Sequence, residues 1–80
     1  MDVVVRVFAA WRDVVGKDQV KVTGLARSAT VGDVRKRLSA DWPALEGLPA
    51  AAAVDHRFAT DEATLREAQV VAFVPPVSGG

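Results

Sequence analysis

The chain has 80 residues, of which 50% are apolar and 25% are charged, a composition typical of one small globular domain rather than a disordered segment. Ten Lys and Arg balance ten Asp and Glu, which argues against binding to nucleic acid or to an acidic membrane surface. The absence of cysteine excludes disulfides, thiolate metal sites and a cysteine nucleophile.

The N-terminal segment alternates as a strand does. Val3, Val5 and Val7 share one face, which should point into the core. The other face carries Arg6 and should be exposed, and Phe8 would lie on it. The segment is too short and too charged for a signal-peptide core or a membrane span, so we expect a cytoplasmic protein.

Residues 9–22 predict a short helix and a second strand. Apolar residues at helical spacing precede Gly16, a residue type that commonly ends helices. Val20 and Val22 alternate with Lys21 and should face the core. The two strands would pair antiparallel, with the short helix inside the connecting loop.

Residues 30–42 give the clearest helix signal. Thr30 can cap its N-terminus, and Asp33 stands three residues later, where a carboxylate favours the helix dipole. An inward apolar stripe would consist of Val31, Val34 and Leu38. The basic run 35–37 should take the solvated face, and Pro43 should stop the helix.

The rest of the chain predicts loops and three strands. A loop follows Pro43, then a short strand at 51–54, a turn at 55–57 and a short strand at 58–59. Leu65 would be the one buried residue of the next loop. In the last strand, 69–74, Val71 and Phe73 share one face, and two prolines then end the strand. One amphipathic helix over a mixed sheet would bury these faces.

Conventional catalytic groups are few. His56 is alone in a predicted turn, and the Asp61-Glu62 pair in a loop is expected to be solvated. Trp11 and Trp42 should pack at the rim of the small core. No phosphate-binding glycine loop and no metal-ligand pattern occur, so we expect no active site on this domain itself.

Two features favour a partner protein. Apolar residues on the solvent side of the sheet, Phe8, Phe58, Ala72 and Val74, would form a docking surface if the first and last strands are neighbours. The sequence also ends in two glycines, which can enter a narrow channel because they carry no side chain. The terminal carboxylate would be the reactive group, and a partner would have to activate it, for instance with AMP.

Three segments together resemble a known family. The opening VRVFAAWRDVVG, the central TVGDVRKRL and the ending VAFVPPVSGG resemble the small subunit of molybdopterin synthase, a MoaD/ThiS-like family of ubiquitin-like sulfur carriers. The resemblance covers nearly the whole chain, and its most specific part is the C-terminal segment. It implies an α+β fold of β-grasp type in residues 1–75, with about four to five strands on one main helix. Residues 76–80 would form a flexible, extended Gly-Gly tail.

The resemblance also implies a reaction cycle in molybdenum cofactor biosynthesis. A ubiquitin-activating-type adenylyltransferase would use ATP to adenylate the Gly80 carboxylate, and a sulfurtransferase would supply sulfur for a thiocarboxylate. The tail would then enter the large subunit of molybdopterin synthase, in a heterotetramer, and pass its sulfur to the cyclic pterin precursor there. No cofactor would be bound permanently.

Site residues carry over by position. Gly80 would bear the sulfur. The partner would contact Gly79, Ser78, Val77, Pro76, Pro75, Phe8, Phe58 and Val74. Asp55 departs from the asparagine typical of the family, and Arg66-Glu67 departs from its Asp-Gly turn. These departures bear on the geometry of two turns and leave the chemistry unchanged.

Two other functions stay open. One is a sulfur carrier for another acceptor, such as the thiamine thiazole, a cysteine precursor or a tRNA base, or a ubiquitin-like protein modifier. Thiazole carriers usually lack the double proline found here. The other is a non-catalytic β-grasp interaction module, for which deletion of Gly79 and Gly80 would change nothing.

Overall fold

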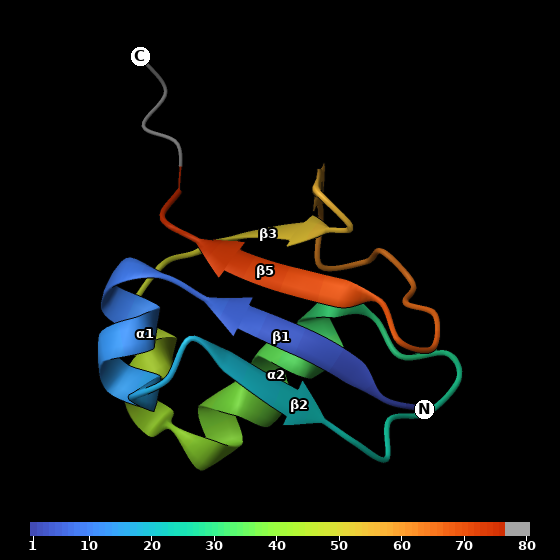
Figure 1. The fold of residues 1–80 in the computed structure, drawn as a ribbon, viewed down its shortest axis with the longest axis horizontal. Coiled ribbons are helices and arrows are strands. Elements are labelled where there is room, and N and C mark those ends of the chain that lie inside the picture. The colour runs from blue at the N-terminus through green and yellow to red at the C-terminus, as the bar shows by residue number, and fades with distance from the viewer. Residues whose placement is uncertain (77–80) are drawn as a thin grey trace.

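The computed structural model describes residues 1–76 and shows a five-stranded sheet with a long helix across one face (Figure 1). The elements in chain order are β1 Val3–Val7, α1 Ala9–Val15, β2 Gln19–Val22, α2 Val31–Asp41, the 3₁₀ helix η1 Pro43–Gly47, β3 Ala51–Val54, β4 Arg57–Ala59 and β5 Val70–Val74. Every strand predicted from the sequence is present, and the helix over a mixed sheet is confirmed.

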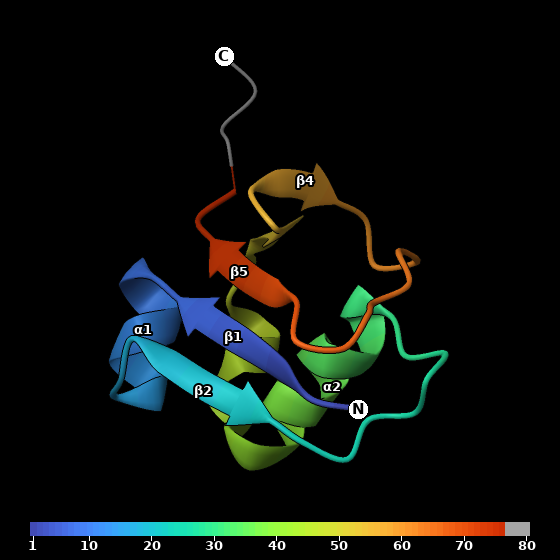
Figure 2. The same ribbon diagram turned by 45° about the vertical axis from the view of Figure 1, so that its right-hand side comes forward.

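The order of strands across the sheet is β2-β1-β5-β3-β4. β1 and β2 pair antiparallel, as predicted, and α1 lies in the connection between them. β1 and β5 pair parallel, whereas β3 pairs antiparallel with both β5 and β4. The last strand is therefore central, with β1 on one side and β3 on the other. Figure 2 shows β2, β1 and β5 side by side.

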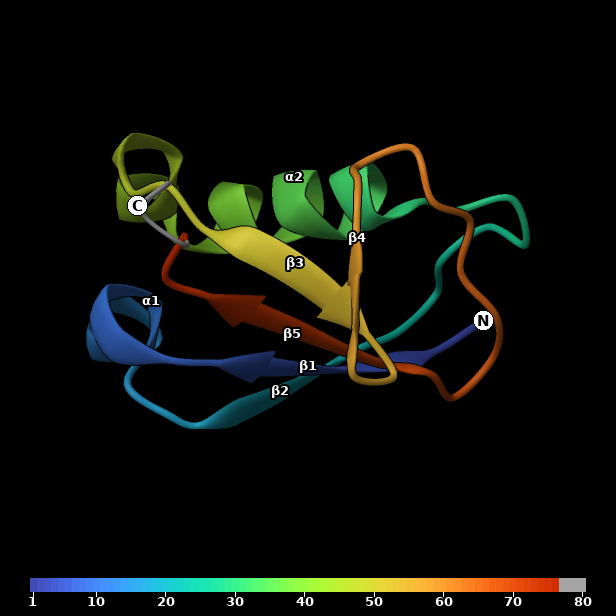
Figure 3. The same ribbon diagram turned by 90° about the horizontal axis from the view of Figure 1, so that it is seen from above.

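The core lies between the sheet and α2, which Figure 3 shows on one side of the strands. Strand alternation directs one face of β1 and β5 into it, and Val5, Val71 and Phe73 are fully buried. The predicted stripe of α2 meets them, with 0–1% exposure for Val31, Val34 and Leu38. Leu65 is buried too, as the sequence predicted.

Local signals in the sequence set the helix ends. The Thr30 hydroxyl accepts a hydrogen bond from the Asp33 backbone N–H at 3.3 Å, and the Asp33 carboxylate accepts one from the Thr30 N–H at 2.9 Å. This reciprocal capping box confirms the predicted start of α2. At the end of α1, Gly16 has a φ of 81°, a left-handed conformation that glycine adopts without steric cost.

Two expectations were wrong, one about residues 43–47 and one about Trp11. Residues 43–47 form η1 rather than a loop, with Pro43 in its first turn and Leu45 only 1% exposed. Trp11 is not a rim residue: it is 3% exposed, and its ring stacks on that of Phe73 with centroids 4.7 Å apart. Its indole N–H donates to the Leu48 carbonyl oxygen at 2.8 Å, which satisfies the one polar atom of the buried ring.

Candidate docking surface and C-terminal strand

The parallel pairing of β1 with β5 builds an apolar surface on the side of the sheet away from α2. Val4 pairs with Val70, and Arg6 pairs with Ala72, on this side. Phe8 still has extended dihedral angles, so the alternation of β1 continues to it and places it beside Val74. The condition set by the sequence analysis, that the first and last strands be neighbours, is met.

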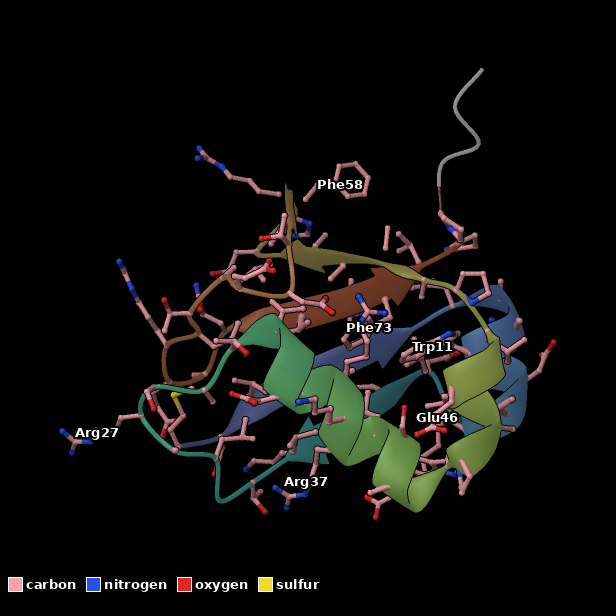
Figure 4. The ribbon with its side chains drawn as sticks, turned by 180° about the vertical axis from the view of Figure 1, so that it is seen from behind. Trp11, Arg27, Arg37, Glu46, Phe58 and Phe73 are labelled. Atoms are coloured by element: carbon pink, nitrogen blue, oxygen red, sulfur yellow. The ribbon has the colours of Figure 1, made fainter. Side chains whose placement is uncertain are left out.

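β3 and β4 extend the same surface. Ala51 pairs with Val74 and Ala53 with Ala72, while Ala53 also pairs with Phe58 on β4. Phe58 is 71% exposed, and Figure 4 shows its ring standing out from the sheet. The outer face, as we call this surface, consists of Val4, Arg6, Phe8, Ala51, Ala53, Phe58, Val70, Ala72 and Val74.

The structure places the predicted contact residues in two groups. Phe8 and Val74 are neighbours, whereas Phe58 lies on the same face but two strands further along. Ala51 and Ala53, which connect these groups, were not predicted from the sequence. Their signal was the alternation of the AAAV segment, which is weak because alanine is common on either side of a sheet.

The outer face borders the point where the chain leaves the sheet. β5 ends at Val74, and Pro75 and Pro76 follow as exposed residues. Neither proline can donate a backbone hydrogen bond to a neighbouring strand, which accounts for the end of β5 at this point. Val77, Ser78, Gly79 and Gly80 lie outside the described residues.

Arg35 lies against the core rather than on the solvated face of α2, which corrects the sequence prediction. Its guanidinium carbon is 5.0 Å from the ring centroid of Phe73 and 5.9 Å from that of Trp11. The same group donates to the Ala50 carbonyl at 3.0 Å and pairs with Asp61 at 2.9 Å. A long side chain can cover apolar rings while its charged end reaches polar partners.

This arrangement also corrects the expectation for Asp61, which is paired rather than simply solvated. Because Arg35 touches the backbone just before β3 and the ring of Phe73 in β5, it links α2 to both of these strands. The pair is only half-buried, with side-chain exposures of 27% for Arg35 and 50% for Asp61. We therefore assign it a modest contribution to stability.

A hydrogen-bonded turn fixes the other end of β5. The Asp55 carboxylate accepts hydrogen bonds from the Val70 N–H at 3.1 Å and from the Gln69 side-chain amide at 3.0 Å. These two bonds, chiefly the one from Val70, hold the pKa of Asp55 below its ordinary value because they stabilise the charged form. Asp55 and His56 have φ values of 47° and 72°, so aspartate supports the left-handed turn where the family typically has asparagine.

The second departure from the family pattern falls in the turn before β5. The turn forms, and Ala68 takes the left-handed position in it with a φ of 66°. The Ala68 N–H donates to the Asp2 carbonyl oxygen at 2.8 Å, and the Glu67 carboxylate accepts from the Asp2 N–H at 2.6 Å. The turn thereby ties the start of β5 to the start of β1, so a residue other than glycine is accommodated there.

Among residues 1–76, the structure contains no cluster of His, Asp and Glu that could hold a metal ion. His56 is exposed in its turn, as the sequence predicted. No helix in the described part of the chain is long and apolar enough to cross a membrane. The outer face and the strand that leads out of it are thus the candidate functional site.

Comparisons with known proteins show the family of the chain. The model described as the ThiS family matches residues 5–80. The chain belongs to the ThiS family. Among solved structures, this ThiS-family protein is similar to SAMP1 from Haloferax volcanii, with a TM-score of 0.85 and 27% identity over 100% of both chains. No curated protein matches the sequence.

Two further structures share the fold. A putative molybdopterin converting factor subunit 1 from Pyrococcus furiosus gives a TM-score of 0.88 at 23% identity, covering 96% of this chain and 99% of its own. Subunit 1 in a complex with subunit 2 of the molybdopterin-converting factor from Helicobacter pylori gives 0.65 at 20% identity, over 100% of both chains. The β-grasp fold and the MoaD/ThiS resemblance are confirmed. The functional class is that of a ThiS/MoaD-like sulfur carrier or a ubiquitin-like modifier.

Proposed function

We propose that this protein is a sulfur carrier for molybdopterin synthesis and that Gly80 bears the sulfur as a C-terminal thiocarboxylate. One observation carries the proposal: the ThiS family match extends to residue 80 and so includes Gly79 and Gly80. The structure adds a reason why these residues could be presented to an enzyme. They follow a central strand, and the docking surface lies beside the end of that strand.

The proposed chemistry begins at the terminal carboxylate, which is a poor acyl donor until it is activated. In an adenylyltransferase of the ubiquitin-activating type, a carboxylate oxygen would attack the α-phosphorus of ATP and release pyrophosphate. The persulfide of a sulfurtransferase would then displace AMP and form an acyl disulfide, and a thiol would reduce that disulfide to release the Gly80 thiocarboxylate; sulfide would displace AMP and give the thiocarboxylate directly. Oxyanion stabilisation would come from the partner, so the carrier needs only a stable domain and an accessible tail. Because the cycle consumes ATP, we propose that it takes place in the cytoplasm.

We further propose that the large subunit of molybdopterin synthase receives the charged tail. The Helicobacter pylori structure, a complex of subunits 1 and 2 of the molybdopterin-converting factor, supports a partner of this kind. Phe8, Phe58 and Val74 would contact that partner. The segment from Pro75 to Gly79 would extend into the active site of the large subunit and contact it there. Two copies of each subunit would form a heterotetramer, and the carrier would hold no cofactor of its own.

A second candidate is a ubiquitin-like protein modifier. Its support is the likeness to SAMP1, which extends over the whole of both chains at 27% identity. The first chemical step would be the same, but a lysine amine would displace AMP and form an amide with Gly80. The two functions therefore differ in the nucleophile that follows adenylation.

The experiment that tests the proposal is intact mass measurement after incubation with the cognate adenylyltransferase, ATP and sulfide. The expected product is heavier by the difference between one sulfur and one oxygen atom, and fragmentation should locate that difference at Gly80. A variant without Gly80 should show no shift while its thermal unfolding stays close to that of the wild type. Charging of that variant, or no charging of the wild type by an enzyme active on another carrier, would contradict the proposal.

The acceptor is tested next with the charged protein. Conversion of the cyclic pterin precursor by the large subunit, with loss of the extra mass, would support the molybdopterin function. Formation of amide-linked conjugates in place of that conversion would favour the protein modifier. Deletion of Gly79 and Gly80 without effect on either reaction would leave only an interaction module.

A further inference from the structure

Arg6 has an unusual position for a charged side chain. It is exposed in the middle of β1, and its neighbours on the outer face are Val4 and Phe8 along the strand and Ala72 on β5. On β2 its partner is Gln19, which is uncharged. The guanidinium carbon lies 5.4 Å from the centroid of the Phe8 ring. A permanent positive charge is thus set among apolar residues.

Within the described residues 1–76, no carboxylate lies within ion-pair distance of Arg6. The two ion pairs found there are Arg12 with Asp18 and Arg35 with Asp61. The outward strand positions on this side include one more basic residue, Lys21 on β2, which lines a pocket with Val4 and with two acidic residues, Asp2 and Glu67. Further along β1, around Arg6 and Phe8, the outer face combines apolar side chains with positive charge.

Docking would change the surroundings of Arg6. An apolar partner surface that covers Phe8 and Val74 would also remove water from the Arg6 guanidinium, because Arg6 lies on the same face of β1. A charge buried without a counter-ion is strongly unfavourable, so a stable complex requires an anion at this point. The planar guanidinium can donate two parallel hydrogen bonds to one carboxylate, and the Phe8 ring already restricts its position.

We propose that Arg6 determines partner specificity, by selecting a protein whose apolar docking surface carries an Asp or Glu carboxylate opposite Arg6 and Phe8. The inference rests on the docking role of the outer face given under the proposed function. A second copy of this chain fits poorly as the occupant, because a symmetric contact between two outer faces would bring positive charges together. The positive charge of Arg6, which has no ion-pair partner among residues 1–76, thus both disfavours self-association and favours an acidic partner.

The test compares Arg6→Leu with the wild type in binding to the purified adenylyltransferase and to the large subunit, by surface plasmon resonance. Leucine removes the charge but keeps an apolar side chain on the strand. Loss of one partner of a buried charge pair should speed dissociation by about 30-fold. Arg6→Lys should fall between the two, because lysine keeps the charge without the two-pronged geometry.

Arg27→Leu is the matched control. Arg27 is also exposed, but Figure 4 shows it pointing into solvent from the loop before α2, away from Phe58. Its dissociation rate should stay within about twofold of the wild type, as for a surface substitution outside the interface. Thermal unfolding of all variants should match the wild type, because Arg6 makes no buried contact.

Several outcomes would overturn the inference, and they are distinguishable. If Arg6→Leu binds as tightly as the wild type or more tightly, the surface is purely apolar, or Arg6 is paired by this chain's own terminal carboxylate; in either case docking itself stands. If the wild type binds neither protein, the proposed docking fails and this inference fails with it. A concentration-dependent dimer in ultracentrifugation that Arg6→Leu disrupts would identify a second copy as the occupant. In a charge swap, Arg6→Glu should lose binding to the wild-type partner and regain it with a partner in which one acidic residue of the docking surface is changed to Arg. That recovery would confirm the pairing.

Discussion

Phe58→Thr should weaken docking without weakening the fold. Phe58 is 71% exposed on β4, so folding has already buried only a small part of its side chain. Threonine keeps the preference for strand structure but removes the aromatic ring. The substitution therefore separates the contribution of Phe58 to a partner interface from its contribution to the domain.

The expected size follows from the exposed area. Complete burial of a Phe side chain contributes about 1.5–3 kcal/mol, and with 71% still exposed about 1–2 kcal/mol of this remains available to a partner. Such a loss corresponds to an increase in Kd of about 5- to 30-fold. The free energy of unfolding should change by no more than about 0.5 kcal/mol, or about 4 °C in Tm.

The assay measures Kd for the adenylyltransferase and the large subunit by titration calorimetry, together with Tm for each variant. Arg57→Thr is the matched control, because Arg57 is the exposed neighbour in the same strand and strand alternation directs its side chain away from the outer face. An unchanged Kd for both partners would remove Phe58 from the docking surface. A Tm well below that of the control would show that Phe58 packs within the domain and that its exposure has been misjudged.

Three further predictions concern single positions. Phe8→Asp should raise the Kd for the partner by about tenfold or more, since it places a carboxylate on the outer face. Its Tm should stay close to that of the wild type, because Phe8 is the N-cap of α1 and makes no side-chain cap bond, whereas aspartate can make one. A large drop in Tm would contradict this. Asp55→Asn should reduce stability at neutral pH and not in strong acid. The lowered pKa of Asp55 means that its stabilisation is present above the pKa of the unfolded chain and is lost as the pH falls through the lower folded pKa; denaturant unfolding at a series of pH values would reveal a constant difference if this is wrong. Ala68→Gly should stabilise the domain by about 0.5 kcal/mol, because Ala68 has a φ of 66°, which costs an L-residue more than it costs glycine; a lower Tm would refute it.

Arg35 shows why a helix face can be misassigned from the sequence. The run 35–37 contains three basic residues, and their charge alone predicts that all three are solvated, although consecutive residues do not share one face of a helix. In the structure, Arg37 hydrogen-bonds the Thr23 carbonyl oxygen at 2.9 Å, whereas Arg35 turns over Phe73 and Trp11. The difference depends on what lies next to each side of α2, which is information that the helix itself does not carry.

The outer face shows a similar limit. Alternation in β1 and β5 predicted correctly that Phe8 and Val74 lie on the side of the sheet opposite the core. It could not predict that they are neighbours, because the 62 residues 8–69 separate the two strands and the parallel pairing between them depends on the whole chain. The sequence therefore left the pairing of the first and last strands as a condition, and the strand order β2-β1-β5-β3-β4 meets it.

The sequence alone determined the features that depend on a few neighbouring residues. The two faces of each strand, the capping box of α2 and the left-handed glycine after α1 follow from periods of two and 3.6 residues and from local hydrogen bonds. Only the tertiary structure decided which elements touch. The η1 helix, the burial of Trp11 under Arg35 and the position of Arg6 on the apolar outer face, with no ion-pair partner among residues 1–76, arise from contacts between distant segments, and such contacts leave no local pattern in the sequence.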